Sequence, residues 1–195
     1  KTTYTDLWNA GRIDTDLLYH NLMEVYRYGN VADPRVYVDT FVNYNFNATN
    51  IRIAFARLGA ELARRGEKEK AVEVLDYGLE QMPVSQFQYT YQYLPYIRAY
   101  YEAGATEKGD ALFDSYAKNL EEYVDYFLSF PDNRQYLIEN QFADKLTALA
   151  ELHRIAENYG RTDRAARILN LFDWLFGPEG QTDYTEYEQT VLPTE

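Results

Sequence analysis

Residues 55–83, "FARLGAELARRGEKEKAVEVLDYGLEQMP", decide the fold of this chain. Apolar side chains recur here every three or four positions, which is the spacing of an amphipathic α-helix. The first run ends at Gly66, a residue type that commonly follows the last turn of a helix, and the second run ends before Pro83. Two helical runs joined by so short a connection predict an antiparallel helical hairpin.

The same stretch matches the repeat pattern of tetratricopeptide proteins, which has a period of about 34 residues. When Pro83 is placed at position 32, the positions that pack the two helices together hold Phe55, Leu58, Gly59, Leu62, Ala71, Leu75 and Gly78. Glycine or alanine at three of these positions allows the helices to approach closely, and the larger side chains fill the space between them. The match therefore predicts both the hairpin and its packing.

Two weaker copies of the pattern follow, found by aligning Gly104 and then Gly160 with Gly66. The second copy has at its packing positions Tyr93, Tyr96, Ile97, Tyr100, Gly109 and Phe113. The third copy has Leu149, Leu152, His153, Ala156, Ala165, Leu169 and Phe172. The copies are spaced farther apart than one repeat, so the helix over 105–129 should run long and another long helix should begin near Asn133. Gly177-Pro178 should end the last helix.

We therefore predict an all-α fold of tetratricopeptide-like antiparallel helical hairpins in a short, irregular right-handed superhelix. Three regions are expected along the chain. Residues 1–47 form an N-terminal helix, near 15–28, and an irregular packing segment. Residues 48–177 form the helical-repeat domain, and residues 178–195 form an acidic C-terminal tail that is loosely held.

The groove side of the first copy is expected to be covered by the chain itself. Its groove positions hold only apolar or small side chains, Ile53, Ala56, Ala60 and Ala63, which would otherwise form an exposed apolar patch. The segment 31–46 or the first helix should pack there. The candidate side chains in that segment are Val36, Val38, Phe41, Tyr44 and Phe46. If the segment is the cover, the change Phe41→Asp should lower the melting temperature by several degrees.

Tyrosines are concentrated just before Gly104, where six of the chain's 20 lie between Tyr89 and Tyr101. The alignment places Tyr93, Tyr96 and Tyr100 at packing positions, so they should be core residues that each need a hydrogen-bond partner. Pro95 fits if the helix begins at residue 91 or 92, because amides of the first turn have no partner within the helix.

The residues that the alignment turns toward the groove are the candidate binding surface. They are Tyr91, Arg98 and Tyr101 from the second copy and Arg154 and Glu157 from the third. Such a surface contacts a protein or peptide partner in many repeat proteins. The alternative is a solvated helix face with no ligand.

Composition excludes several functional classes. The net charge of −12 disfavours binding to nucleic acid or to anionic membranes, since both require clustered basic residues. No apolar run reaches the ~18 to 20 residues of a membrane span, so direct membrane insertion is not expected. The absence of cysteine excludes disulfides, thiolate metal sites and a cysteine nucleophile.

Catalytic and metal-binding patterns are weak. His20 and His153 are far apart, and only Glu157, four residues after His153, stands at a ligand spacing. A core or capping histidine is the simpler interpretation of each. The acidic cluster Glu121, Glu122 and Asp125 is typical of a wet helix face rather than of a glycosidase pair. We therefore expect no metal, no cofactor and no enzymatic activity in this chain.

A family resemblance extends over residues ~13 to 175. Three blocks carry it in order: "IDTDLLYHNLMEVYRYGNVADPRVYVDT", "NIRIAFARLGAELARRGEKEKAVEVLDYGLEQMP" and "LPYIRAYYEAGATEKGDALF". Together they resemble the soluble C-terminal region of protein O-mannosyltransferase-like multi-pass membrane proteins of Bacteroidetes-type bacteria. The resemblance implies an N-terminal membrane domain of the glycosyltransferase type, outside this sequence, and a helical-repeat domain on the periplasmic side. The family's catalytic residues would lie in that membrane domain.

Three functions are compatible with these patterns. The first is a noncatalytic helical-repeat module of an O-mannosyltransferase-like protein, which contacts the acceptor protein or its own membrane domain. The second is an independent tetratricopeptide-type adaptor that binds a partner peptide. The third is a small carbohydrate-binding module that stacks sugars on Tyr91 and Tyr101.

Overall fold

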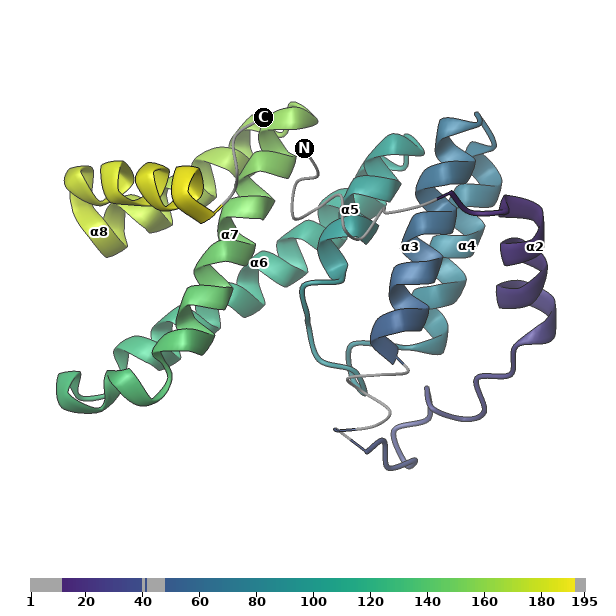
Figure 1. Cartoon of the computed structure of the whole chain (residues 1–195), viewed down its shortest axis with the longest axis horizontal. Coiled ribbons are helices and arrows are strands. Elements are labelled where there is room, and N and C mark those ends of the chain that lie inside the picture. Colours follow the sequence, from purple (N-terminus) through teal and green to yellow (C-terminus); the bar gives the residue numbers. More distant parts are fainter. Residues whose placement is uncertain (1–11, 40, 42–47, 192–195) are drawn as a thin grey trace. The chain divides into compact units, whose positions relative to one another are not determined.

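The computed structural model describes residues 12–39, 41 and 48–191, and every regular element in this part of the chain is a helix (Figure 1). The all-α class is therefore confirmed. The chain divides into two compact units, which we call the first unit, Ile13–Asn119, and the second unit, whose helices follow from Leu120 onward. Within the described residues, no helix is both long and apolar enough to cross a membrane.

The first unit begins with two short helical elements that form one continuous stretch. Helix α2 covers Thr15–His20, and a π-helical stretch, η1, covers Asn21–Val25. Asp14 caps the start, since its carboxylate accepts a hydrogen bond of 3.0 Å from the amide of Leu17. The predicted helix near 15–28 is thus present, but it ends before Tyr26, whose backbone is extended.

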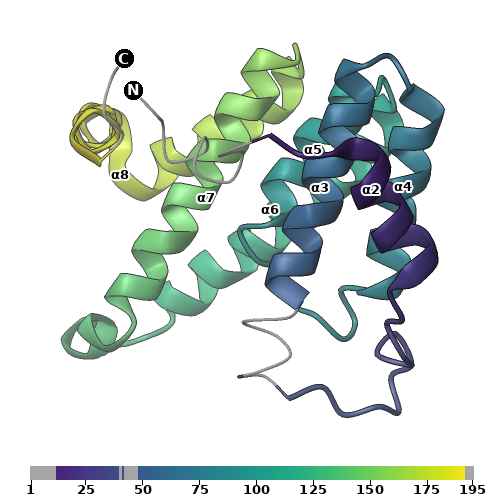
Figure 2. The same ribbon diagram turned by 45° about the vertical axis from the view of Figure 1, so that its right-hand side comes forward.

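Helices α3, Thr49–Arg64, and α4, Lys68–Gln81, are the hairpin predicted from residues 55–83, and they contact each other along their length (Figure 2). The small residues lie where the helices come closest. A β-carbon built on Gly59 would stand 2.7 Å from the side chain of Leu75. One built on Gly78 would stand 2.8 Å from the ring of Phe55. No side chain larger than hydrogen fits at either place without movement of a buried neighbour.

Three helices end in the same way, and these ends support the alignment of the three copies. Gly66, Gly104 and Gly160 all have positive φ angles, of 85°, 77° and 66°. After each glycine the next amide donates to a carbonyl five residues back, as in Glu67 to Leu62 at 2.9 Å. Both features define the Schellman motif, in which glycine adopts the left-handed conformation at little cost.

Helix α5 covers Tyr93–Glu102 and packs against both α3 and α4. It begins one or two residues later than predicted, and Pro95 lies in its first turn, where a missing amide costs no helical hydrogen bond. The side chains of Tyr93, Tyr96 and Tyr100 are buried, which confirms that these tyrosines are core residues. Helix α6, Thr106–Leu128, follows and continues into the second unit.

The described residues before α3 cover the hairpin as expected, through the first helix and Val38 (Figures 1 and 2). Helix α2 contacts α3, and Leu22 is only 1% exposed within the same core cluster as Ala56 and Ala63. Tyr28 packs on Phe55, with ring centroids 5.9 Å apart. Val31 and Val38 are partly buried against this core.

The expectation that Phe41 packs in the groove is wrong. Its side chain is 68% exposed, because Leu22 from the first helix already fills the core on this side. Tyr44 and Phe46 lie outside the described residues. Ile53 and Ala60, the other two groove positions, are half-buried.

We accordingly expect Phe41→Asp to change the free energy of unfolding by less than about 0.5 kcal/mol, as is usual for exposed positions. Leu22→Ala serves as the contrast and should cost about 2 kcal/mol or more, because it leaves a cavity in the core. Urea unfolding followed by circular dichroism measures both. A loss for Phe41→Asp as large as that for Leu22→Ala would contradict this packing.

The second unit contains the end of α6, a 3-10 helix η3 over Asp132–Leu137, α7 over Glu139–Asn158 and α8 over Thr162–Val191. Phe127 of α6 stacks on Phe142 of α7 with ring centroids 3.7 Å apart. The long helix expected near Asn133 begins six residues later, because the chain after Pro131 first forms the 3-10 turn.

Helix α8 differs from the prediction in two ways. Its buried side chains include Ala165, Ile168 and Phe172, whereas Leu169, placed at a packing position by the alignment, is 38% exposed. Ala165, Ile168 and Phe172 are three and four positions apart, so they lie on one face of the helix, and Leu169 lies beside that face. Gly177, with φ 68°, interrupts the helix as predicted, but helical backbone resumes and extends to Val191 where a loosely held tail was expected.

Candidate functional site

Helix α5 leaves one narrow face uncovered, and this face is the candidate functional site. Seven of its ten side chains are buried: Tyr93, Leu94, Tyr96, Ile97, Ala99, Tyr100 and Tyr101. The remaining three, Pro95, Arg98 and Glu102, are half-buried or exposed. Their spacing of three and four residues places them along one side of the helix. We call these three residues the open face of α5.

Arg98 is the central residue of this face. Its side chain is half-buried, and among the described residues it has no hydrogen-bond or ion-pair partner. A guanidinium that has lost part of its water gains free energy when a carboxylate approaches it. Arg98 is therefore suited to receive an acidic group from another molecule.

The repeat alignment and the helical spacing lead us to expect small and charged residues beside Arg98. Helix α3, which contacts α5, has Ala60 at the repeat position equivalent to Arg98. Tyr91 precedes α5 by two residues and is half-buried. Glu102 is exposed and already takes part in another interaction.

Tyr101 does not lie on this face, so its assignment to the groove is wrong. The side chain is 8% exposed, and its ring lies against α6, where a β-carbon on Gly109 would stand 2.6 Å from it. The Tyr101 hydroxyl donates a hydrogen bond of 2.9 Å to Asp110. Gly109 provides the space that the ring occupies, and this glycine across the turn was the signal for the burial of Tyr101.

The other two candidate residues, Arg154 and Glu157, lie on α7 of the second unit. Arg154 donates to the buried carboxylate of Glu151 at 2.6 Å, so its charge is already partly balanced. Glu157 is exposed, and its carboxylate is 3.8 Å from Nδ1 of His153. The five residues are thus divided, with Tyr91, Arg98 and Tyr101 in the first unit and this pair in the second.

A buried arginine, Arg52, was missed by the sequence analysis. It is 2% exposed, and one guanidinium nitrogen donates to the carbonyls of Met82 at 2.9 Å and of Phe87 at 3.1 Å. The guanidinium carbon also lies over two rings, 5.3 Å from the centroid of Phe87 and 4.8 Å from that of Tyr93. Arg52 thereby ties the start of α3 to the connection between α4 and α5. It serves stability and not binding, since solvent does not reach it.

Several tyrosines of the tyrosine-rich stretch are held by internal contacts, but the buried hydroxyl of Tyr96 has no hydrogen-bond partner among the described residues, so the expectation of a partner for each core tyrosine is not met there. The Tyr89 ring stacks on Tyr116 of α6 with centroids 5.5 Å apart, and its hydroxyl bonds to the hydroxyl of Ser115. Tyr100 donates to Asp76 of α4 at 2.8 Å, and Lys108 of α6 pairs with the same carboxylate. Burial, together with the bond to Asp76, raises the pKa of Tyr100 far above its usual value. Its hydroxyl therefore stays protonated as a donor.

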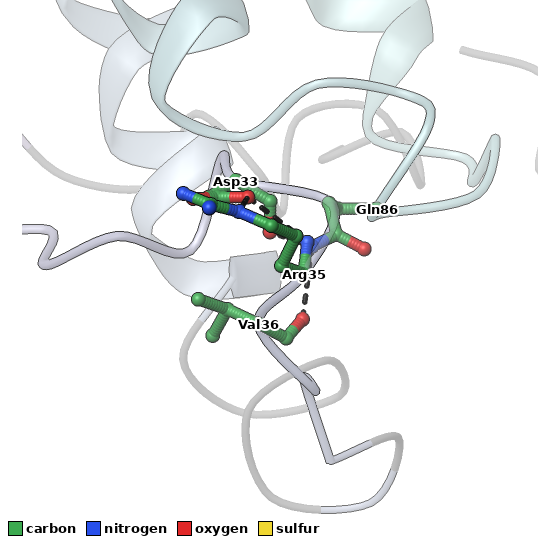
Figure 3. Close-up of polar contacts among 4 residues, drawn as sticks. All are labelled: Asp33, Arg35, Val36 and Gln86. Atoms are coloured by element: carbon green, nitrogen blue, oxygen red, sulfur yellow. Dashed lines mark hydrogen bonds and ion pairs between the residues drawn. The ribbon is translucent and has the colours of Figure 1, made fainter.

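The loop after Gly29 is held by two side chains (Figure 3). The side-chain nitrogen Nε2 of Gln86 donates to the backbone carbonyls of Asp33 at 2.5 Å and of Val36 at 3.0 Å. Within the loop, the Arg35 guanidinium donates hydrogen bonds of 3.0 and 2.6 Å to the two carboxylate oxygens of Asp33. The loop is therefore fixed to the connection before α5.

The Asp33–Arg35 contact gives a pH prediction. Hydrogen bonds from Arg35 lower the pKa of Asp33 below 3.8. Because the pKa of the Asp33 carboxyl is lowered in the folded chain, the contact stabilises the fold at pH values above the ordinary carboxyl pKa. This stabilisation is lost as the pH falls through the lowered pKa. We expect an NMR titration to place Asp33 below 3.8 and the change Arg35→Gln to raise it toward that value. An unchanged Asp33 pKa in the variant would contradict the contact.

Among the described residues, no three His, Asp or Glu side chains gather as metal ligands would. No protein-family model, curated protein or solved structure matches this chain. Its function is therefore inferred from the residues and their geometry.

Proposed function

We propose that this chain is a noncatalytic helical-repeat module that binds a protein partner through the open face of α5. The observation that carries the proposal is Arg98, half-buried on that face with no partner among the described residues. The hydroxyls of Tyr100 and Tyr101, on the same helix, are engaged in internal hydrogen bonds. Arg98 is thus the charged group of α5 that remains available to another molecule.

The proposal includes a tetratricopeptide-like arrangement of the hairpins. It is supported by the close packing at Gly59 and Gly78 and by the shared helix ends at Gly66, Gly104 and Gly160. In such arrays the first helices of successive repeats stand side by side and line a concave surface. Helices α3 and α5, which contact each other, would be those helices here.

The partner that fits this surface is an extended peptide with an acidic side chain or a free C-terminal carboxylate. Arginine binds carboxylates through paired hydrogen bonds, which fix orientation as well as add affinity. In the proposed arrangement, the small side chain of Ala60 on α3 would leave room for a peptide backbone. A preformed face of this kind also lowers the ordering cost of binding.

Fluorescence anisotropy with labelled peptides tests this role. Acidic peptides of ~12 residues should bind saturably and more weakly at higher salt, whereas basic peptides of the same length should not. The change Arg98→Ala should remove most of the affinity, while Arg35→Ala, which alters an exposed arginine elsewhere in the unit, should not. Absence of saturable binding, or equal binding by the Arg98→Ala variant, would count against the proposal.

We also propose that the module belongs to a membrane-anchored O-mannosyltransferase-like protein and works on the periplasmic side. The sequence blocks that resemble this family support it, and the acidic peptide would then come from the acceptor protein or from the membrane domain itself. A reading frame encoding several membrane spans upstream of Lys1 is the expected result of sequencing the gene. An unrelated upstream frame would leave the independent adaptor as the function.

A carbohydrate-binding role is less well supported, because it required open rings at Tyr91 and Tyr101, and Tyr101 is buried against Gly109. Titration with mannosides, followed by tyrosine fluorescence, should give no saturable change. A saturable change would restore this alternative.

A further inference from the structure

Two opposite charges lie one turn apart on the open face of α5. Arg98 is half-buried and Glu102 is exposed, and both belong to the side of α5 that the core leaves uncovered. Four residues of α-helix correspond to about 6 Å along the helix axis. The face therefore presents a positive group and then a negative group in a fixed order and at a fixed spacing.

These two residues do not neutralise each other. Arg98 has no hydrogen-bond or ion-pair partner among the described residues, so it does not pair with Glu102. An arginine that precedes a glutamate by four positions is in the less favourable order for a helical ion pair. Glu102 takes part in another interaction, but the two oxygens of a carboxylate have several acceptor positions and can serve a second donor. Both charges can therefore contact another molecule.

The other end of the open face has no charged side chain. Pro95 is half-buried one turn before Arg98, and Tyr91, which precedes α5 by two residues, is also half-buried. From Arg98, the face thus continues as an apolar surface toward the start of α5 and as a negative charge toward its end.

An extended peptide matches this arrangement. Alternate side chains of an extended chain point to the same side, and residues two positions apart are separated by about 6.6 Å. This separation is close to the axial distance between Arg98 and Glu102. When a peptide carboxylate pairs with Arg98, the side chain two positions away on one side reaches Glu102. The side chain two positions away on the other side lies over Pro95.

We propose that the open face of α5 selects a peptide in which an apolar, an acidic and a basic residue occupy alternate positions, an inference that rests on the peptide-binding function proposed above. The acidic residue pairs with Arg98, the basic residue pairs with Glu102, and the apolar residue covers Pro95. A second acidic residue in place of the basic one is repelled by Glu102, so a run of acids is a poorer ligand than the mixed motif. Specificity then comes from the order of the residues and not from the net charge of the peptide.

Two isomeric labelled peptides test this inference by fluorescence anisotropy with the intact chain. The first contains Leu-x-Glu-x-Lys among serine and glycine residues. The second contains Leu-x-Glu-Lys-x, which turns the lysine to the opposite side of the extended chain without changing composition or charge. Because side chains alone do not fix the chain direction, both peptides are also made in reverse order and isomers of the same direction are compared.

In one of the two directions, the alternating isomer should bind about two- to fivefold more tightly, which is the range for an exposed ion pair. Equal affinity of the isomers in both directions would overturn the motif, while the binding of acidic peptides would still support the peptide-binding function. Absence of saturable binding by these peptides and by acidic peptides alike would refute that function together with the motif.

Variants of Glu102 provide the second test. The change Glu102→Lys should reverse the preference, so that Leu-x-Glu-x-Glu binds this variant more tightly than Leu-x-Glu-x-Lys does. The change Glu102→Gln should make the two isomers bind equally, whereas Glu80→Gln, which alters an exposed glutamate of α4, should leave their difference intact. Circular dichroism checks that each variant is folded, as expected for exposed positions. An unchanged preference in Glu102→Lys would overturn the role of Glu102.

Discussion

Replacing Arg52 by alanine is expected to lower the free energy of unfolding by about 2 to 4 kcal/mol, because the change removes a buried hydrogen-bond donor and leaves a cavity in its place. The guanidinium of Arg52 donates to the carbonyls of Met82 and Phe87. The rings of Phe87 and Tyr93 would also lose the group that lies between them and α3.

Two further variants separate the causes of this effect. The variant Arg52→Met keeps most of the side-chain volume but cannot make the hydrogen bonds. Its free energy of unfolding should therefore lie between those of the wild type and Arg52→Ala. Arg35→Ala is the matched control, since the Arg35 side chain is 88% exposed, and it should change stability by less than about 0.5 kcal/mol. Urea unfolding monitored by circular dichroism gives all three values. Equal stability of Arg52→Ala and Arg35→Ala would show that Arg52 does not join α3 to the α4–α5 connection.

Of these variants, Gly78→Val is expected to destabilise the fold most, lowering the free energy of unfolding by about 3 kcal/mol or more. A β-carbon at this position would stand 2.5 Å from the hydroxyl oxygen of Tyr96 and 2.8 Å from Phe55. Both rings are buried and cannot swing into solvent. The helices α3, α4 and α5 would therefore have to separate.

The matched control for this variant is Glu80→Val on the exposed face of the same helix. There valine costs only its helix propensity, roughly 0.6 kcal/mol relative to a good helix former. Melting temperatures measured by circular dichroism distinguish the two sites. Similar melting temperatures for Gly78→Val and Glu80→Val would mean that α4 does not approach Tyr96 and Phe55 closely.

The sequence predicts the helix pairs well because their packing depends on local, repeated residues. Gly59 and Gly78 mark the closest approaches, and Gly66, Gly104 and Gly160 mark the helix ends. Each of these glycines has a physical role that few other residues can fill, so its position is informative even in a single sequence. The buried tyrosines of α5 follow from the same register.

The sequence did not predict the environment of residues that contact distant parts of the chain. Arg52 is buried because the chain around Phe87 returns to it, and nothing in its own helix indicates this. Phe41 is exposed because Leu22 fills the core first. Tyr101 is buried because Gly109 on the next helix makes room for its ring.

The unpaired state of Arg98 also was not predictable. The alignment identified its side of the helix, but it could not show that Arg98 would have no carboxylate partner among the described residues, whereas Asp76 and Asp110 bond to tyrosines of the same helix. The site therefore depends on which carboxylates the tertiary structure has already used.

The most direct test of the packing that underlies this fold is the free energy of unfolding of Gly59→Ala. Helix propensity alone predicts that alanine stabilises an interior helical position by about 1 kcal/mol relative to glycine. Close approach to Leu75, 2.7 Å from the new β-carbon, predicts the opposite sign. We expect urea unfolding to show a loss of stability. A gain of the size that propensity predicts would contradict the close nesting of α3 and α4.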